Sequence, residues 1–193
     1  MKKLLATILA LVMALSLCSV AWAAGEYDPL PDAVNGTITL TEDVTFSGDA
    51  TLNLTGKTVE TKGYTIIVAS GTVSITGGKF VNETEGVTTK GSEDPHGILA
   101  VNSGATLNIT NASLETKAYQ PLTVEGTCNS VGTTYKCTVA NDKYDSKVMI
   151  SVKGSAAYLN MPSGSVEMVA SESASDGMYG IYASNGGKVT VGD

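Results

Sequence analysis

The chain has 193 residues, enough for one domain or slightly more, and a formal charge of −7 at pH 7. All twelve basic residues are lysines, so an arginine-rich surface for phosphates is lacking and we expect no binding to nucleic acids. Threonine, serine and glycine, with 24, 18 and 21 residues, exceed leucine, glutamate and arginine, which favours strands over helices.

The first 23 residues have the three parts of a secretory signal peptide. Two lysines stand at positions 2 and 3, an apolar run covers residues 4–20, and Ala21 and Ala23 are the small residues of a cleavage site. The alternatives are an uncleaved membrane anchor and lipid modification at Cys18. We predict cleavage after Ala23, which leaves a charge of −9 and a protein that is secreted or held at the cell surface, without membrane contact.

Short alternating runs follow a polar, proline-containing stretch, residues 24–36, which we interpret as an N-terminal cap or linker. In each run aliphatic side chains alternate with threonine, asparagine or serine, as in half-buried strands. The clearest runs are residues 37–40, 51–54, 73–75, 107–109 and 189–191.

Six glycines punctuate these runs at intervals typical of solenoids, 23, 33, 22, 28 and 33 residues apart. They are Gly48, Gly71, Gly104, Gly126, Gly154 and Gly187. An apolar pair precedes each of them, such as Ile98/Ala100 before Gly104, and most are followed by a second pair. The pattern predicts one all-β domain over residues 37–193, built of degenerate stacked coils of about 22–33 residues. A β-sandwich is the alternative, because short alternating strands also fit that fold.

The string from Ser70 to Phe80 (SGTVSITGGKF), echoed from Ser103 to Leu114, resembles the right-handed parallel β-helix of the pectin-lyase-like superfamily. With the signal peptide, the coils are similar to bacterial extracellular β-helix proteins of the surface or adhesin type. The resemblance implies parallel pairing of successive coils about 4.8 Å apart around a common core. It also implies stacked polar ladders on or near Asn53 and Asn108.

Many members of this superfamily act on carbohydrates, so a polysaccharide lyase or glycoside hydrolase is the alternative function. Hydrolases of the fold typically carry paired aspartates, an Asn-Thr-Asp run and a Gly-His-Gly, and lyases an Arg or Lys base. The chain has no Asp-Asp pair, no Asn-Thr-Asp run and no arginine. Its nearest feature is the group Glu93, Asp94 and His96, a weak candidate for acid–base chemistry or metal binding that we interpret as a solvated turn. We therefore expect a non-catalytic protein.

Cys128 and Cys137 form an even pair in a chain that leaves the reducing cytosol. The residues between them read as a turn that enters a strand, so we predict a hairpin closed by a disulfide, which stabilises the fold by about 2–3 kcal/mol. We expect no metal and no cofactor. The alternative to a metal-free protein is a Ca²⁺ ion held by Asp142 and Asp145.

Four tyrosines are candidate glycan contacts, because aromatic rings stack on sugars or anchor a protein partner. They are Tyr144, Tyr158, Tyr179 and Tyr182. Tyr182 alternates with Ile181 and Ala183, so we expect it to point outward. Threonine-rich outer faces are also similar to those of ice-binding solenoids, but such arrays need coils of constant length, and we expect no ice binding here.

These observations favour a secreted or cell-surface β-helix module with a structural or adhesive role. We expect its partner to be an extracellular glycan or a surface protein, contacted through the side face and the loops. The last run, residues 189–193, has no polar cap, so we expect either a longer product that this chain truncates or end-to-end self-association.

Overall fold

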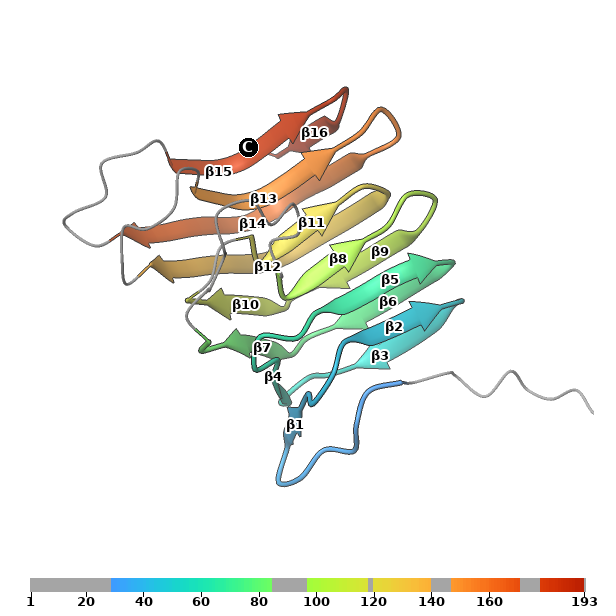
Figure 1. Cartoon of the computed structure of the whole chain (residues 1–193), viewed down its shortest axis with the longest axis vertical. Helices are drawn as coiled ribbons and strands as arrows, with labels where there is room; N and C mark the ends of the chain where they lie inside the picture. Colours follow the sequence, from blue (N-terminus) through green and yellow to red (C-terminus); the bar gives the residue numbers. More distant parts are fainter. Residues whose placement is uncertain (1–28, 85–96, 118–119, 140–146, 171–177, 193) are drawn as a thin grey trace, which may run out of the picture.

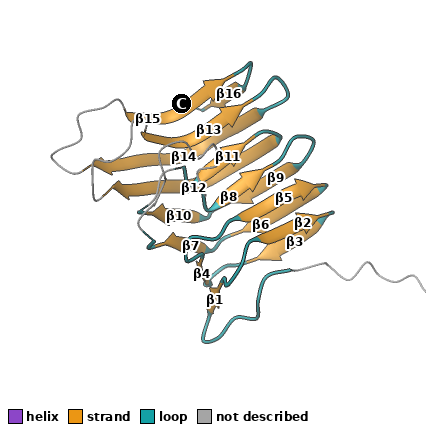
Figure 2. Ribbon diagram, in the orientation of Figure 1, coloured by secondary structure: helices purple, strands orange, loops and turns teal. Residues whose placement is uncertain are grey.

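The computed structural model describes residues 29–84, 97–117, 120–139, 147–170 and 178–192. Over these residues the chain consists of strands and their connections (Figure 2), which confirms the predicted all-β class. In the described part there is no helix long and apolar enough to cross a membrane.

The strands belong to two sheets. The six-stranded sheet contains β2 (Val44–Ser47), β5 (Ile66–Ser70), β8 (Leu99–Val101), β11 (Leu122–Val124), β13 (Lys147–Lys153) and β15 (Met178–Ser184). The ten-stranded sheet has two arms. The first arm contains β3 (Ala50–Asn53), β6 (Thr72–Thr76), β9 (Thr106–Thr110) and β16 (Lys188–Val191). The second arm contains β1 (Thr37–Thr39), β4 (Thr58–Glu60), β7 (Lys79–Asn82) and β10 (Ser113–Thr116). Two long strands pass through both arms, β12 (Thr127–Val139) and β14 (Tyr158–Ala170).

Every ladder between these strands is parallel. The chain passes from β2 through β3 and β4 and returns in β5, which lies beside β2 (Figure 1). The same path then recurs, so one strand of each repeat stacks on its counterpart in the next. An antiparallel sandwich does not fit this pairing.

The length of the repeats varies at one corner. In the six-stranded sheet Val44, Ile66, Leu99, Leu122, Ile150 and Ile181 stand in register, so the repeats are 22, 33, 23, 28 and 31 residues long. Only residues 77–78 separate β6 from β7, whereas residues 83–98 separate β7 from β8. The extra residues of the longer repeats are therefore inserted mainly into the connection between the second arm and the six-stranded sheet. The register of each sheet is kept although the repeats differ in length.

The core is a set of apolar columns that run from repeat to repeat. Alternate side chains point inward, as the sequence pattern predicts, and full burial of each Val, Leu, Ile or Phe contributes about 1.5–3 kcal/mol. One column contains Ile38, Val59, Phe80, Leu114, Tyr135 and Val166. All of these are buried except Val166, which is partly exposed on β14, the last described strand of the second arm.

The six predicted glycines all lie at the corner between the six-stranded sheet and the first arm. At Gly71 φ is +74°, and a Cβ atom would lie 2.6 Å from the Gly48 carbonyl carbon. At Gly126 a Cβ atom would lie 2.4 Å from the carbonyl oxygens of Asn102 and Ala105. These positions require glycine because stacked corners bring backbone against backbone.

The predicted disulfide and its hairpin are wrong. Residues 127–139 form the single strand β12, which bends near Gly132 and continues from the first arm into the second without reversing. Cys128 pairs with Leu107 in the first arm, and Cys137 pairs with Thr116 in the second. No disulfide joins the two thiols, because the strand places them in different arms. Both cysteines are buried.

One predicted inward pair has the wrong register. The sequence pattern favoured Ile98 and Ala100 before Gly104, but Leu99 and Val101 occupy the core columns of β8 and Ala100 is half-buried. Ile98 is buried as well, at the corner before the strand. Three successive apolar residues fit both registers, so alternation does not choose between them.

Candidate functional site

The outer side of the first arm carries three columns of side chains that are neutral and polar, except for Val131 and Lys188. The middle column contains Thr51, Ser74, Asn108, Asn129, Asn160 and Thr190. The flanking columns contain Thr72, Thr106, Thr127, Tyr158 and Lys188 on one side, and Asn53, Thr76, Thr110, Val131 and Ser163 on the other. We call these three columns the polar face. Its side chains are exposed or half-buried, and Lys188 is its single ionisable cation.

Hydrogen bonds join the middle column across the strands. The Asn129 amide Nδ2 donates to Oδ1 of Asn108 over 2.9 Å, and Nδ2 of Asn108 donates to Oγ of Ser74 over 3.3 Å. The prediction of a polar ladder at Asn108 is confirmed. Asn53 lies in a flanking column instead, where its Oδ1 accepts a hydrogen bond from the Thr55 backbone N–H.

The candidate tyrosines do not form one cluster. Tyr158 lies on the polar face, and its hydroxyl donates to Oγ1 of Thr190 over 3.2 Å. Tyr179 and Tyr182 lie on β15 of the six-stranded sheet, with ring centroids 5.4 Å apart and planes tilted by 55°. Tyr182 is 44% exposed, so its predicted outward orientation is confirmed. Tyr144 lies outside the described residues.

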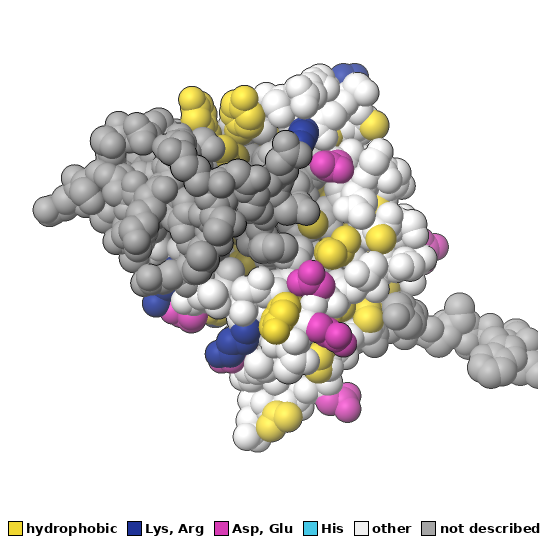
Figure 3. Space-filling model, viewed as in Figure 1, with side chains coloured by type: hydrophobic (Ala, Val, Ile, Leu, Met, Phe, Trp, Pro, Cys, Tyr) yellow, Lys and Arg dark blue, Asp and Glu magenta, His cyan; other side chains and the backbone are white. Residues whose placement is uncertain are grey.

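The outer side of the second arm is charged. Lys79 pairs with Glu115 over 2.8 Å, and Lys136 pairs with Glu167 over 3.2 Å. These ion pairs are exposed, so each contributes at most about 1 kcal/mol. On the side that carries the six-stranded sheet, the described surface is mostly neutral with scattered charges (Figure 3). The polar face thus differs from the second arm in its chemistry.

The buried polar groups of β12 have a structural role. The hydroxyls of Ser130 and Tyr135 are 2.9 Å apart inside the core. Burial raises the pKa of Cys128 to about 12 and that of Cys137 to about 11, so both thiols stay protonated and unreactive at neutral pH. Burial, and secondly the proximity of Cys128, also raise the pKa of Tyr135, whereas the hydrogen bond with Ser130 lowers it.

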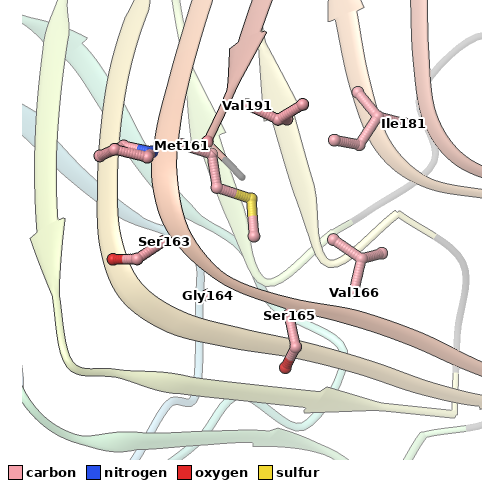
Figure 4. A pocket seen from close by; sticks show the side chains of 9 residues that line it. Met161, Ser163, Gly164, Ser165, Val166, Ile181 and Val191 are labelled. Carbon is pink, nitrogen blue, oxygen red and sulfur yellow. The ribbon is translucent and has the colours of Figure 1, made fainter.

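A cavity of about 300 Å³ lies at the last described repeat (Figure 4). Met161, Val166, Ile181 and Val191 line it with apolar side chains, and no titratable group is among its lining residues. The cavity continues the apolar core column and lacks the acid–base groups of an active site.

The predicted acid–base and calcium candidates, Glu93, Asp94, His96, Asp142 and Asp145, lie outside the described residues. Among the residues that the structure describes, His, Cys, Asp and Glu do not gather in any group of three that is suited to a metal ion.

Comparison of the chain with protein-family models, with curated proteins and with solved structures found no match.

Sequence reasoning missed most of the polar face. Asn129 and Asn160 stand in the same column as Asn108 because each lies one residue after the first inward residue of its strand. The signal was present as Thr-x-Asn at residues 106–108 and 127–129 and as Tyr-x-Asn at 158–160. The expected hairpin at residues 128–137 hid the second of these motifs.

Proposed function

We propose that this chain is a secreted or cell-surface parallel β-helix module with a structural or adhesive role. In this proposal it resembles surface proteins of the pectin-lyase-like type in fold and carries out no catalysis. The parallel stacking of three-strand repeats around one core supports the fold. The signal-peptide pattern of residues 1–23 supports export.

The observation that carries the adhesive role is the polar face. A side surface that only keeps a protein soluble is usually charged, as the second arm is, with Lys and Glu in exposed pairs. The polar face instead offers amides and hydroxyls in register over successive strands. None of its residues is a carboxylate, whereas glycoside hydrolysis needs two. A partner held by this face is therefore bound without being cleaved.

Binding and turnover measurements test this function. We expect the purified protein to be retained on immobilised extracellular polysaccharides or surface proteins, and to release no reducing ends or unsaturated products from the polysaccharides. Product release would instead establish the alternative, a carbohydrate-active enzyme. An absence of retention on every surface tested would leave only an inert structural role and would refute adhesion.

A further inference from the structure

We propose that the polar face binds a neutral, linear polysaccharide that lies along the direction in which the strands stack. This inference rests on the adhesive function proposed above and names its ligand and its site. The central residues are Asn108, Asn129, Asn160 and Tyr158.

The geometry of the polar face suits a polymer with a short repeat. Neighbouring parallel strands lie about 4.8 Å apart, so the same type of side chain recurs at that interval along the middle column. The rings of an extended polysaccharide follow one another at a similar distance. Successive sugar rings therefore meet equivalent amide and hydroxyl groups at Asn108, Asn129 and Asn160.

The middle column retains hydrogen-bonding capacity for such a ligand. An asparagine amide has two N–H donors and an oxygen that accepts two hydrogen bonds. In the ladder Asn108 and Asn129 each use one donor, and only Asn108 uses an acceptor position. Asn160 has no side-chain hydrogen bond to another described residue, although it stands opposite Asn129 in register. Sugar hydroxyls, which both donate and accept, match this combination.

Tyr158 supplies an aromatic ring next to the amides. It stands two residues before Asn160 on the same face of β14. Its hydroxyl donates a hydrogen bond to Thr190 on the neighbouring strand β16, which orients the ring toward that strand. Sugar rings have apolar C–H faces that pack against aromatic rings, whereas their edges carry the hydroxyls. The pair of Tyr158 and Asn160 therefore addresses both surfaces of one sugar unit.

The charge of the protein favours a neutral polysaccharide over an acidic one. The chain has a net charge of −7, and the polar face carries one lysine, so an acidic polysaccharide gains little at the face and is repelled by the molecule as a whole. The described side chains of the face are exposed or half-buried. The corners that border it are short, and the long connections leave from the opposite corner, between the second arm and the six-stranded sheet.

Unequal repeats do not disturb this surface. Residues 83–98 lengthen one repeat by about half, yet Ser74 and Asn108 on either side of that insertion remain in register and hydrogen-bonded. Unequal repeat lengths are therefore compatible with regular columns on this face. Ice remains a competing occupant, and the experiment below distinguishes it.

Affinity electrophoresis of the full chain provides the test. The probes are hydroxyethylcellulose and galactomannan, which are neutral and linear in their backbones, and polygalacturonate, which is acidic. We expect both neutral polymers to retard the protein and polygalacturonate to leave it unretarded. The Asn160→Ala and Tyr158→Ala variants should each bind the retarding polymer at least about tenfold more weakly, and Tyr158→Phe, which keeps the ring, within about threefold of wild type.

A matched control is Ser151→Ala, in the six-stranded sheet of the same repeat, which should leave the affinity unchanged. Thermal unfolding of each variant shows that the fold is intact. Asn160→Ala is well suited to this comparison, because the Asn160 side chain has no hydrogen bond to another described residue that the substitution would remove. Retardation by polygalacturonate alone, retention on proteins alone, or equal affinity of Asn160→Ala and wild type would overturn the ligand assignment and leave the adhesive function standing. Thermal hysteresis without polysaccharide binding would assign the face to ice and overturn the proposal. Failure to bind any polymer or surface protein would refute both the ligand and the adhesive function.

Discussion

The buried hydroxyl pair of Ser130 and Tyr135 allows a sharp test of the core of β12. Each residue differs in type and size from the aliphatic residue beside it in its core column. Tyr135 pairs with Leu114, and Ser130 pairs with Ile109. The larger side chain and the smaller one occupy the same strand, and their oxygens are 2.9 Å apart in a fully buried site. The large Tyr135 and the small Ser130 thus compensate for each other in volume, and their hydroxyls satisfy each other by a hydrogen bond.

Tyr135→Phe keeps the ring but leaves the Ser130 hydroxyl without this partner, which should lower the free energy of unfolding by about 1–3 kcal/mol. Ser130→Ala leaves the phenol oxygen unsatisfied in the same way and should cost a similar amount, about 1–3 kcal/mol. The double variant removes both polar groups together, so neither is left unpaired. Its loss should be smaller than the sum of the single losses, with a coupling energy of about 1–3 kcal/mol.

Guanidinium unfolding curves of the four proteins measure this coupling, provided that the dependence on denaturant is the same for all. Thr134→Val is the control, because it removes a hydroxyl bond to Ser113 of 3.1 Å that is exposed to solvent. The control should change stability by less than about 0.5 kcal/mol. Additive losses in the double variant would show that the hydroxyls are not coupled and would refute the compensation argument.

Two further predictions concern the thiols and the glycine corners. Both buried thiols have a pKa above the value of 9.0 for an unperturbed cysteine, so above pH 9 the unfolded chain releases its protons first. The free energy of unfolding should then fall by up to about 1.4 kcal/mol per pH unit for each thiol, and between pH 8 and 10 it should fall less steeply in Cys128→Val; identical slopes would contradict the burial of this thiol. Gly126→Ala would place a Cβ 2.4 Å from the Ala105 carbonyl oxygen and should cost about 1–3 kcal/mol in urea unfolding. The matched variant Gly48→Ala, whose Cβ meets nothing within 4 Å, should change stability by less than about 1 kcal/mol, and equal losses in the two variants would disprove the close-approach argument.

The sequence by itself determined the class of fold and most of the division between inside and outside. Alternation of aliphatic with hydroxyl or amide side chains is a local property of a strand, so it identified Leu107 and Ile109 as core residues and Asn108 as an outer one. The sequence also located the glycines of the first corner, and at Gly71 and Gly126 the reason is that one backbone approaches another too closely for a side chain.

Only the tertiary structure decided which positions meet between repeats. The bend of β12 separated Cys128 from Cys137, and the two arms and the second sheet placed Tyr158 and Tyr182 on different faces. The alignment of Asn108, Asn129 and Asn160 arises in the same way, since residues 21 and 31 positions apart become neighbours through parallel pairing. A local pattern specifies which side of a strand a residue occupies. Its partner on the neighbouring strand depends on where extra residues are inserted between strands, and here most of them are inserted at one corner.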